Sequence, residues 1–140
     1  MSGEDVFVKE IVEDGGVLAR FIPSQEAWKE GLNFFSPESE FIQVGTWGYN
    51  KEKQLLAHSH NRVPRQVNWT QEVLFIHQGR LQAHIYNSRE ELVAEWIASA
   101  GDILIMLSGG HGYTILDDET RVLEIKNGPY VGADKDRRRL

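Results

Sequence analysis

The sequence predicts an all-β domain, a sandwich or barrel of short strands, and two observations lead to this class. Short apolar segments recur along the chain at intervals of about 8–12 residues, and turns rich in Gly, Asn and Asp separate them. Within one segment Leu81, Ala83 and Ile85 alternate with polar residues, the period-two pattern of a strand with two different faces. Only residues 24–32 have a helical pattern, so helix contributes little to the predicted fold.

Each predicted element has a local justification. Residues 6–12 and 17–22 form a hairpin, because residues 13–16 between them are acidic and glycine-rich, as tight turns often are. Residues 24–32 form the one helix, with Ser24 as its cap and Glu26 in its first turn. The other predicted strands are apolar segments bounded by turn residues: 41–49, 54–60, 72–77, 81–86, 92–98, 103–107, 113–116 and 121–126.

Composition limits the class of protein. The chain has 140 residues, of which 41% are apolar and 10% aromatic, enough to bury one core. No apolar stretch approaches the roughly 20 residues of a membrane-spanning helix, and residues 1–5 lack the layout of a secretion signal. The net charge of −6 argues against duplex nucleic acid as a partner. We therefore expect a soluble, cytoplasmic, single-domain protein that binds neither membrane nor nucleic acid.

Histidine is the main candidate for site chemistry, because the chain has five His and no Cys, which excludes thiol catalysis and cysteine-ligated zinc. His58 and His60 lie two apart on a predicted strand, so both side chains project from the same face as Leu56. Two buried imidazoles are costly without partners; a metal ion is an efficient partner, and a hydrogen-bonded core pair is the alternative.

Two further residues could join this pair. Glu72 opens the next predicted strand, and His111 lies in the glycine-rich turn formed by residues 108–112. Three imidazole nitrogens and one carboxylate oxygen around a divalent ion leave coordination positions open for a substrate. The alternatives are an exposed carboxylate at a strand start for Glu72 and an ordinary turn residue for His111.

The order of these residues resembles the two sequence motifs of the cupin superfamily. His58-Ser59-His60, followed by Glu72 and then Gly79, matches the first motif, with a long insert after His60. The segment 101–111, from Gly-Asp to Gly-Gly-His, matches the second motif without its usual Pro. The resemblance implies the cupin fold, a double-stranded β-helix or jelly-roll barrel.

The resemblance also implies the organisation of the whole chain. It covers residues 41–126 as the barrel core of a single cupin domain over residues 1–140, with the hairpin and helix in residues 6–32 before it. The basic tail of residues 134–140 is expected to be solvated and frayed. A homodimer is expected from the resemblance alone, because small cupins commonly pair through their sheets or exchange terminal strands.

The cofactor implied by the resemblance is a divalent metal ion, Fe, Mn, Ni or Zn, held by His58, His60, Glu72 and His111. A ligand set of His and Glu without sulfur suits a catalytic or exchangeable ion better than a closed structural zinc. Because the insert between His60 and Glu72 is longer than in the cupin motif, the motif spacing supports Glu72 less than it supports the three histidines.

The expected function is that of an enzyme acting on a small anionic or sugar-like metabolite. Arg62 and Arg65, in the insert, would orient an anionic substrate, and Tyr113 would line the pocket next to the ligand turn. Three alternatives remain open at this point. They are a non-catalytic module that binds a ligand or a metal, a metal-free sugar isomerase or epimerase that uses His as a base, and a purely structural barrel.

Overall fold

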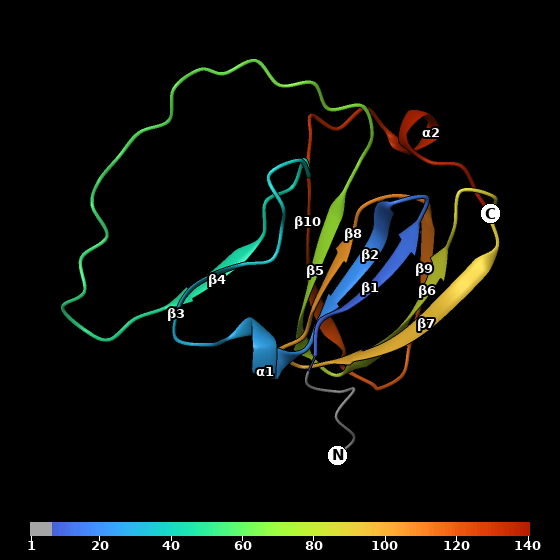
Figure 1. Ribbon diagram of the computed structural model, residues 1–140. Helices are drawn as coiled ribbons and strands as arrows, with labels where there is room; N and C mark the ends of the chain where they lie inside the picture. The colour runs from blue at the N-terminus through green and yellow to red at the C-terminus, as the bar shows by residue number, and fades with distance from the viewer. Residues whose placement is uncertain (1–6) are drawn as a thin grey trace.

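The computed structural model describes residues 7–140, and strands dominate it (Figure 1). Within this range the chain forms ten strands and two one-turn helices. The elements are β1 (Lys9–Glu13), β2 (Gly16–Ile22), α1 (Ser24–Ala27), β3 (Gly31–Phe34), β4 (Gly45–Gly48), β5 (Glu72–Gln78), β6 (Arg80–Tyr86), β7 (Leu92–Ser99), β8 (Ile103–Met106), β9 (Gly110–Ile115), β10 (Arg121–Lys126) and α2 (Ala133–Asp136). The predicted all-β class is therefore confirmed.

The strands form two main sheets and one separate hairpin. A five-stranded sheet has the order β1-β2-β8-β5-β10, and a three-stranded sheet has the order β7-β6-β9. Strands β3 and β4 pair only with each other, and all pairings are antiparallel. The two main sheets are not joined edge to edge by a ladder, so the barrel implied by the resemblance is not closed in this structure.

The main core lies between the two sheets. The period-two pattern of β6 correctly predicts which residues of that strand face this core. Leu81, Ala83 and Ile85 are each at most 2% exposed, and they pack in one cluster with apolar residues of the five-stranded sheet. Phe21 of β2 meets Trp96 of β7 edge to face, with ring centroids 5.7 Å apart. Burial of each large aliphatic side chain contributes about 1.5–3 kcal/mol to the folded state.

A second core covers the outer face of the five-stranded sheet. Ile22, Ile105 and Leu107 pack there with Ala27 of α1 and with apolar residues of the segment 35–44. That segment crosses the face of the sheet without regular secondary structure. Because no backbone ladder joins it to the strands beneath, side-chain hydrogen bonds must hold it there.

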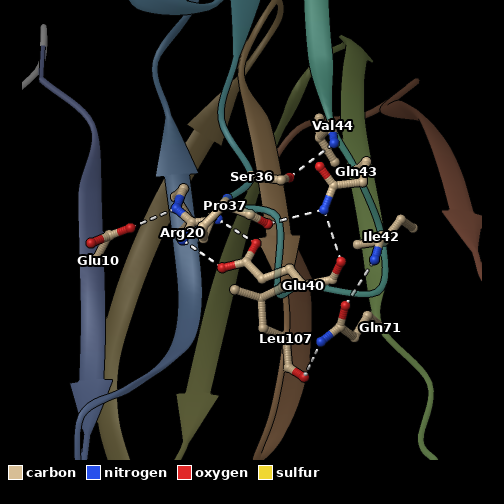
Figure 2. A network of polar contacts seen from close by, with 10 residues as sticks. All are labelled: Glu10, Arg20, Ser36, Pro37, Glu40, Ile42, Gln43, Val44, Gln71 and Leu107. Atoms are coloured by element: carbon tan, nitrogen blue, oxygen red, sulfur yellow. Dashed lines mark hydrogen bonds and ion pairs between the residues drawn. The ribbon is translucent and has the colours of Figure 1, made fainter. Parts of the chain in front are cut away.

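A buried arginine ties this segment to β2 (Figure 2). Arg20 is 4% exposed, and its guanidinium donates to both carboxylate oxygens of Glu40, each at 2.8 Å, and to Glu10 at 2.6 Å. The hydrogen bond to Glu40 is the main factor that raises the pKa of Arg20 above its ordinary value. A charge-assisted, bidentate pair of this kind fixes both distance and orientation.

The residue before β5 makes a second tie, also drawn in Figure 2. The side chain of Gln71 accepts a hydrogen bond from the backbone N–H of Ile42 at 3.0 Å and donates to the carbonyl of Leu107 at 3.3 Å. Its own backbone N–H donates to the side chain of Asn127 at 2.7 Å. The start of β5 is thereby held from three directions.

The helix is shorter than predicted. Residues 24–32 were expected to be helical, but α1 ends at Ala27 and β3 begins at Gly31. Trp28, the residue that follows α1, has a φ of −114° and a ψ of 38°, so the backbone leaves the helical conformation there. Ser24 does not cap the helix with its side chain; instead Asp102 accepts its backbone N–H at 2.8 Å.

The strand predicted at residues 54–60 is not formed, and this is the largest difference from the sequence expectation. Residues 51–69, here named the arm, are all exposed and contain no strand, and Figure 1 shows them arcing away from both sheets (green). A strand needs a neighbour for its backbone hydrogen bonds, and no strand of residues 7–140 pairs with the arm.

The other predicted strands agree with the structure apart from their bounds. The strand expected at residues 41–49 is reduced to β4, Gly45–Gly48. The N-terminal hairpin is formed by β1 and β2, with a bulge between Ile11 and Val12, while Val6 lies outside the described residues. No helix in residues 7–140 is both long and apolar enough to cross a membrane.

Candidate functional site

The candidate site lies at the rim of the sandwich, where the buried first residue of β5 faces β9 and the side chain of His111 is 31% exposed. Glu72 stands opposite Met106 and Lys126 in the five-stranded sheet, on the face turned toward the core. His111 stands opposite buried Ile85 in the three-stranded sheet, so its side chain also points inward. The two residues meet, with His111 Nε2 2.8 Å from Glu72 Oε2.

The surroundings of Glu72 keep its carboxylate charged. The residue is 7% exposed, and burial alone would raise its pKa. The imidazole of His111 beside the carboxylate is the largest influence, and together with the positive charges of Lys126 and Arg137 it lowers the pKa of Glu72 below its ordinary value. Lys126 Nζ lies 4.0 Å from Glu72 Oε1. The site therefore holds an ionised carboxylate among cationic groups.

Tyr113 adds a hydroxyl group to the same interior. It lies two residues after His111 on β9, and the two rings are 5.5 Å apart between centroids. Its hydroxyl is buried and has no hydrogen-bond partner within the described part of the chain. Burial raises the pKa of Tyr113 far above its ordinary value, so the hydroxyl stays protonated. A buried hydroxyl without a partner costs about 1–3 kcal/mol, and a bound ligand could recover that cost.

A glycine turn positions His111. Gly109 has a φ of +75°, and a Cβ at this position would collide with the backbone carbonyl of Tyr86. The glycine-rich turn before His111 is therefore required by the close approach of two backbone segments. The next residue, Gly110, contacts the side chain of Leu140, so the end of the described chain packs at the start of β9.

The structure brings together some of the predicted site residues. Glu72 and His111 meet, and the ring of Tyr113 lies beside that of His111. His58 and His60 lie on the exposed arm, with ring centroids 5.0 Å apart, and His58 Nδ1 lies 3.2 Å from the carbonyl oxygen of Leu56.

The predicted four-ligand metal site is accordingly not assembled within one chain. No group of three or more His, Asp or Glu residues that could hold a metal ion is found among residues 7–140. The expectation that His58 and His60 lie on a strand facing the interior is wrong for the single chain, because the arm has no neighbouring strand to orient it.

The two arginines predicted to bind substrate also lie on the arm. Arg62 and Arg65 are exposed and, with Pro64, line a shallow hollow formed by the arm itself. Arg65 donates to the carbonyl of Val63 at 3.4 Å. In this structure they belong to the arm and not to the cluster of Glu72 and His111.

Lys126 and Arg137 were not identified from the sequence as site residues. The alternation of residues in the strand predicted at 121–126 could have placed Lys126 on the inner face with Val122. Arg137 belongs to the tail expected to be frayed, yet the tail is docked: Thr70 donates to Asp136, and Arg138 pairs with Glu90. No local sequence pattern signals this return of the tail.

The comparisons with known proteins gave no match. No family model, no curated protein and no solved structure matches this chain. The geometry of the site itself must therefore carry the functional argument.

Proposed function

We propose that this protein is a metal-binding, cupin-type enzyme acting on a small anionic or sugar-like metabolite, with its centre at Glu72 and His111. The observation that carries the proposal is the approach of His111 Nε2 to Glu72 Oε2, 2.8 Å apart, from strands of different sheets. An imidazole nitrogen and an ionised carboxylate are suitable donors for Fe, Mn, Ni or Zn. The donor chemistry of this half of the site therefore fits a divalent ion.

His58 and His60 would supply the other two ligands once the arm is brought to the site. A bound ion would act as a Lewis acid toward a substrate oxygen. The residues of the chain then have separate tasks. Lys126 and Arg137 provide positive charge for an anionic group, and the protonated hydroxyl of Tyr113 is free to donate a hydrogen bond to substrate.

Arg62 and Arg65 have a place in the same proposal. They flank Pro64 a few residues after His60, so an arm that delivers the histidines also delivers the two guanidinium groups. Guanidinium groups bind carboxylates and phosphates through paired hydrogen bonds. Together with Lys126 they favour an anionic substrate over a neutral one.

The direct contact between His111 and Glu72 favours a second candidate, a metal-free sugar isomerase or epimerase. In this alternative His111 is the general base, and the carboxylate of Glu72 orients its ring. The hydroxyl of Tyr113, two residues along β9, would then donate a hydrogen bond to the substrate.

Elemental analysis separates the two candidates. Protein purified without chelators or a histidine tag, then supplied with Fe, Mn, Ni and Zn, is expected to retain about one ion per chain. His111→Ala and Glu72→Gln should lose most of it, whereas His77→Ala, which alters an exposed histidine of β5, should retain it. Wild-type protein that binds none of the four metals would overturn the metal proposal and leave the acid–base alternative.

A further inference from the structure

The arm and the free edge of β9 complement each other, and their relationship carries an inference that rests on the proposed metal site. Strand β9 pairs with β6 on one side, and no strand of residues 7–140 pairs with its other side. Its inner face carries His111, Tyr113 and Ile115. Ile115 is 59% exposed although its partner Leu81 is only 2% exposed. The inner face of the sandwich is therefore uncovered along this edge.

The arm has the properties of a strand without a sheet. Of its residues, 54–69 make no backbone–backbone hydrogen bond in the described structure. Leu56 is 84% exposed, and Leu55, Val63 and Val67 are also largely exposed. Unpaired backbone and exposed apolar side chains on one extended segment favour its addition to a sheet edge.

The sequence of the arm matches the edge of β9 in one register. Antiparallel addition in that register pairs ring side chains with ring side chains and an aliphatic side chain with another on the inner face. The pairs are His60 with His111, His58 with Tyr113, and Leu56 with Ile115. On the outer face the same register places Leu55 opposite Leu116, which is 37% exposed. A shift by one residue would turn both histidines away from Glu72.

We propose that the arm of one chain adds to β9 of a second copy, so that His58 and His60 of each chain complete the Glu72–His111 site of the other. Within one chain the arm arcs away from the sheets on the side of the β3–β4 hairpin (Figure 1). Each copy offers the same arm and the same edge, so a reciprocal exchange closes as a two-fold dimer and leaves neither arm unpaired.

The exchange gives the chain a metal site that neither copy has alone. Glu72 and His111 come from the sandwich of one copy, and His58 and His60 come from the arm of the other. Arg62 and Arg65 then reach the site from the same arm, and Leu56 covers the exposed Ile115. The substrate would accordingly contact residues of both chains.

Cross-linking tests the register without any need for metal. The chain has no Cys, so a disulfide can form only between engineered positions. Two chains, one with Leu56→Cys and one with Ile115→Cys, are co-expressed with different affinity tags that lack histidine. Mild oxidation is expected to link them into a disulfide-bonded dimer, with the linked positions identified by peptide mapping. Both side chains are exposed, so neither substitution should prevent folding.

A matched pair controls for chance encounters between exposed thiols. Leu55→Cys with Ile115→Cys places the thiols on opposite faces in the proposed register, so its yield of linked dimer should be several-fold lower. A chain that carries both Leu56→Cys and Ile115→Cys tests closure of the arm on its own sheet. An internal disulfide in a monomer, or equal yields from the two mixed pairs, would overturn the exchange.

Metal content of a mixed dimer links the exchange to the proposed function. One chain carries His58→Ala and His60→Ala, the other carries His111→Ala, and the mixed dimer is isolated by its two tags. Exchange predicts one complete site in that dimer, about half the wild-type metal content, and none in either homodimer. A mixed dimer without metal, where wild type binds metal, would overturn the exchange and leave the proposed function in place. Cross-linked dimer from a wild type that binds no metal would overturn the proposed function alone.

Discussion

Glu72 and His111 belong to different sheets, and their side chains meet in the interior with His111 Nε2 2.8 Å from Glu72 Oε2. Glu72 is the first residue of β5, and His111 follows the glycine turn that begins β9. A contact of this kind depends on the relative position of the two sheets. Residues that fix the sheets therefore also fix the site.

Tyr113→Phe is expected to increase stability and to weaken ligand binding. The hydroxyl that it removes is buried without a partner among the described residues, so its loss relieves a desolvation cost of about 1 kcal/mol. Urea denaturation measures the gain, and binding of sugar phosphates or other small anions, followed by thermal shift, measures the loss. A destabilised variant would mean that the hydroxyl has a partner in the folded protein.

Arg20→Met is expected to destabilise the fold by about 3–5 kcal/mol, because it leaves the carboxylate of Glu40 buried without its cation. The side chain of Glu40 is only 11% exposed. Glu10→Gln is the matched control, since Glu10 is 41% exposed and its loss should cost about 1 kcal/mol or less. Chemical denaturation compares the two, and equal losses would show that Glu40 does not depend on Arg20.

Gly109→Ala is expected to destabilise the protein by about 1–3 kcal/mol, because the residue has a positive φ and its Cβ would collide with the carbonyl of Tyr86. Gly112→Ala, on the adjoining strand β9, is the control, since a Cβ there meets nothing within 4 Å. If both variants unfold at the same urea concentration, the turn before His111 does not need glycine.

Asp102 gives the stability a defined pH dependence. Burial raises its pKa above the ordinary value of 3.8, although backbone N–H groups of Ser99 and Ser24 donate to it. The folded state therefore binds more protons than the unfolded state between pH 3.8 and the raised native pKa. This contribution to stability is present at low pH and declines as the pH rises through that window.

Asp102→Asn tests this dependence. The amide can accept only one of the two N–H groups, so the variant should be less stable at every pH. Its deficit relative to wild type should shrink as the pH rises above 3.8 and then become constant. Urea denaturation across the pH range measures both curves, and a deficit that grows with pH would contradict the raised pKa.

The sequence allowed the strands of the sandwich to be predicted wherever the pattern is local. Strand β6 alternates between buried and polar residues, and the hairpin of β1 and β2 is bounded by its own turn, so neither depends on distant contacts. The order of the motif residues also grouped Glu72 with His111, as expected ligands of one metal ion. Residues 54–60 have an equally good strand pattern, yet a strand forms only where a neighbour supplies hydrogen bonds.

Other parts of the site could not be predicted because they depend on contacts between distant segments. Arg137 comes near Glu72 only because the tail returns to the sandwich, held by Asp136 and Arg138. Similarly, the sequence around Arg20 is that of an ordinary strand. Its guanidinium is buried because it pairs with Glu40, which lies on an irregular segment. Patterns within one segment carry no information about such pairings.

The three hydrogen bonds of Gln71 separate the conformation of the arm from the position of Glu72. Gln71 is held by Ile42, Leu107 and Asn127, so the arm that precedes it ends at a fixed point, and Glu72 keeps its position whatever the arm does. In the proposed exchange, the half of the site formed by Glu72 and His111 would thus be preorganised, and the entropy lost on assembly would be confined to the arm. In the proposed exchange, substitutions at the exposed residues 54–68 would alter ligand binding with little effect on the sandwich, whereas Trp69, which packs on Phe41 and donates to the carbonyl of Leu107, also supports the fold.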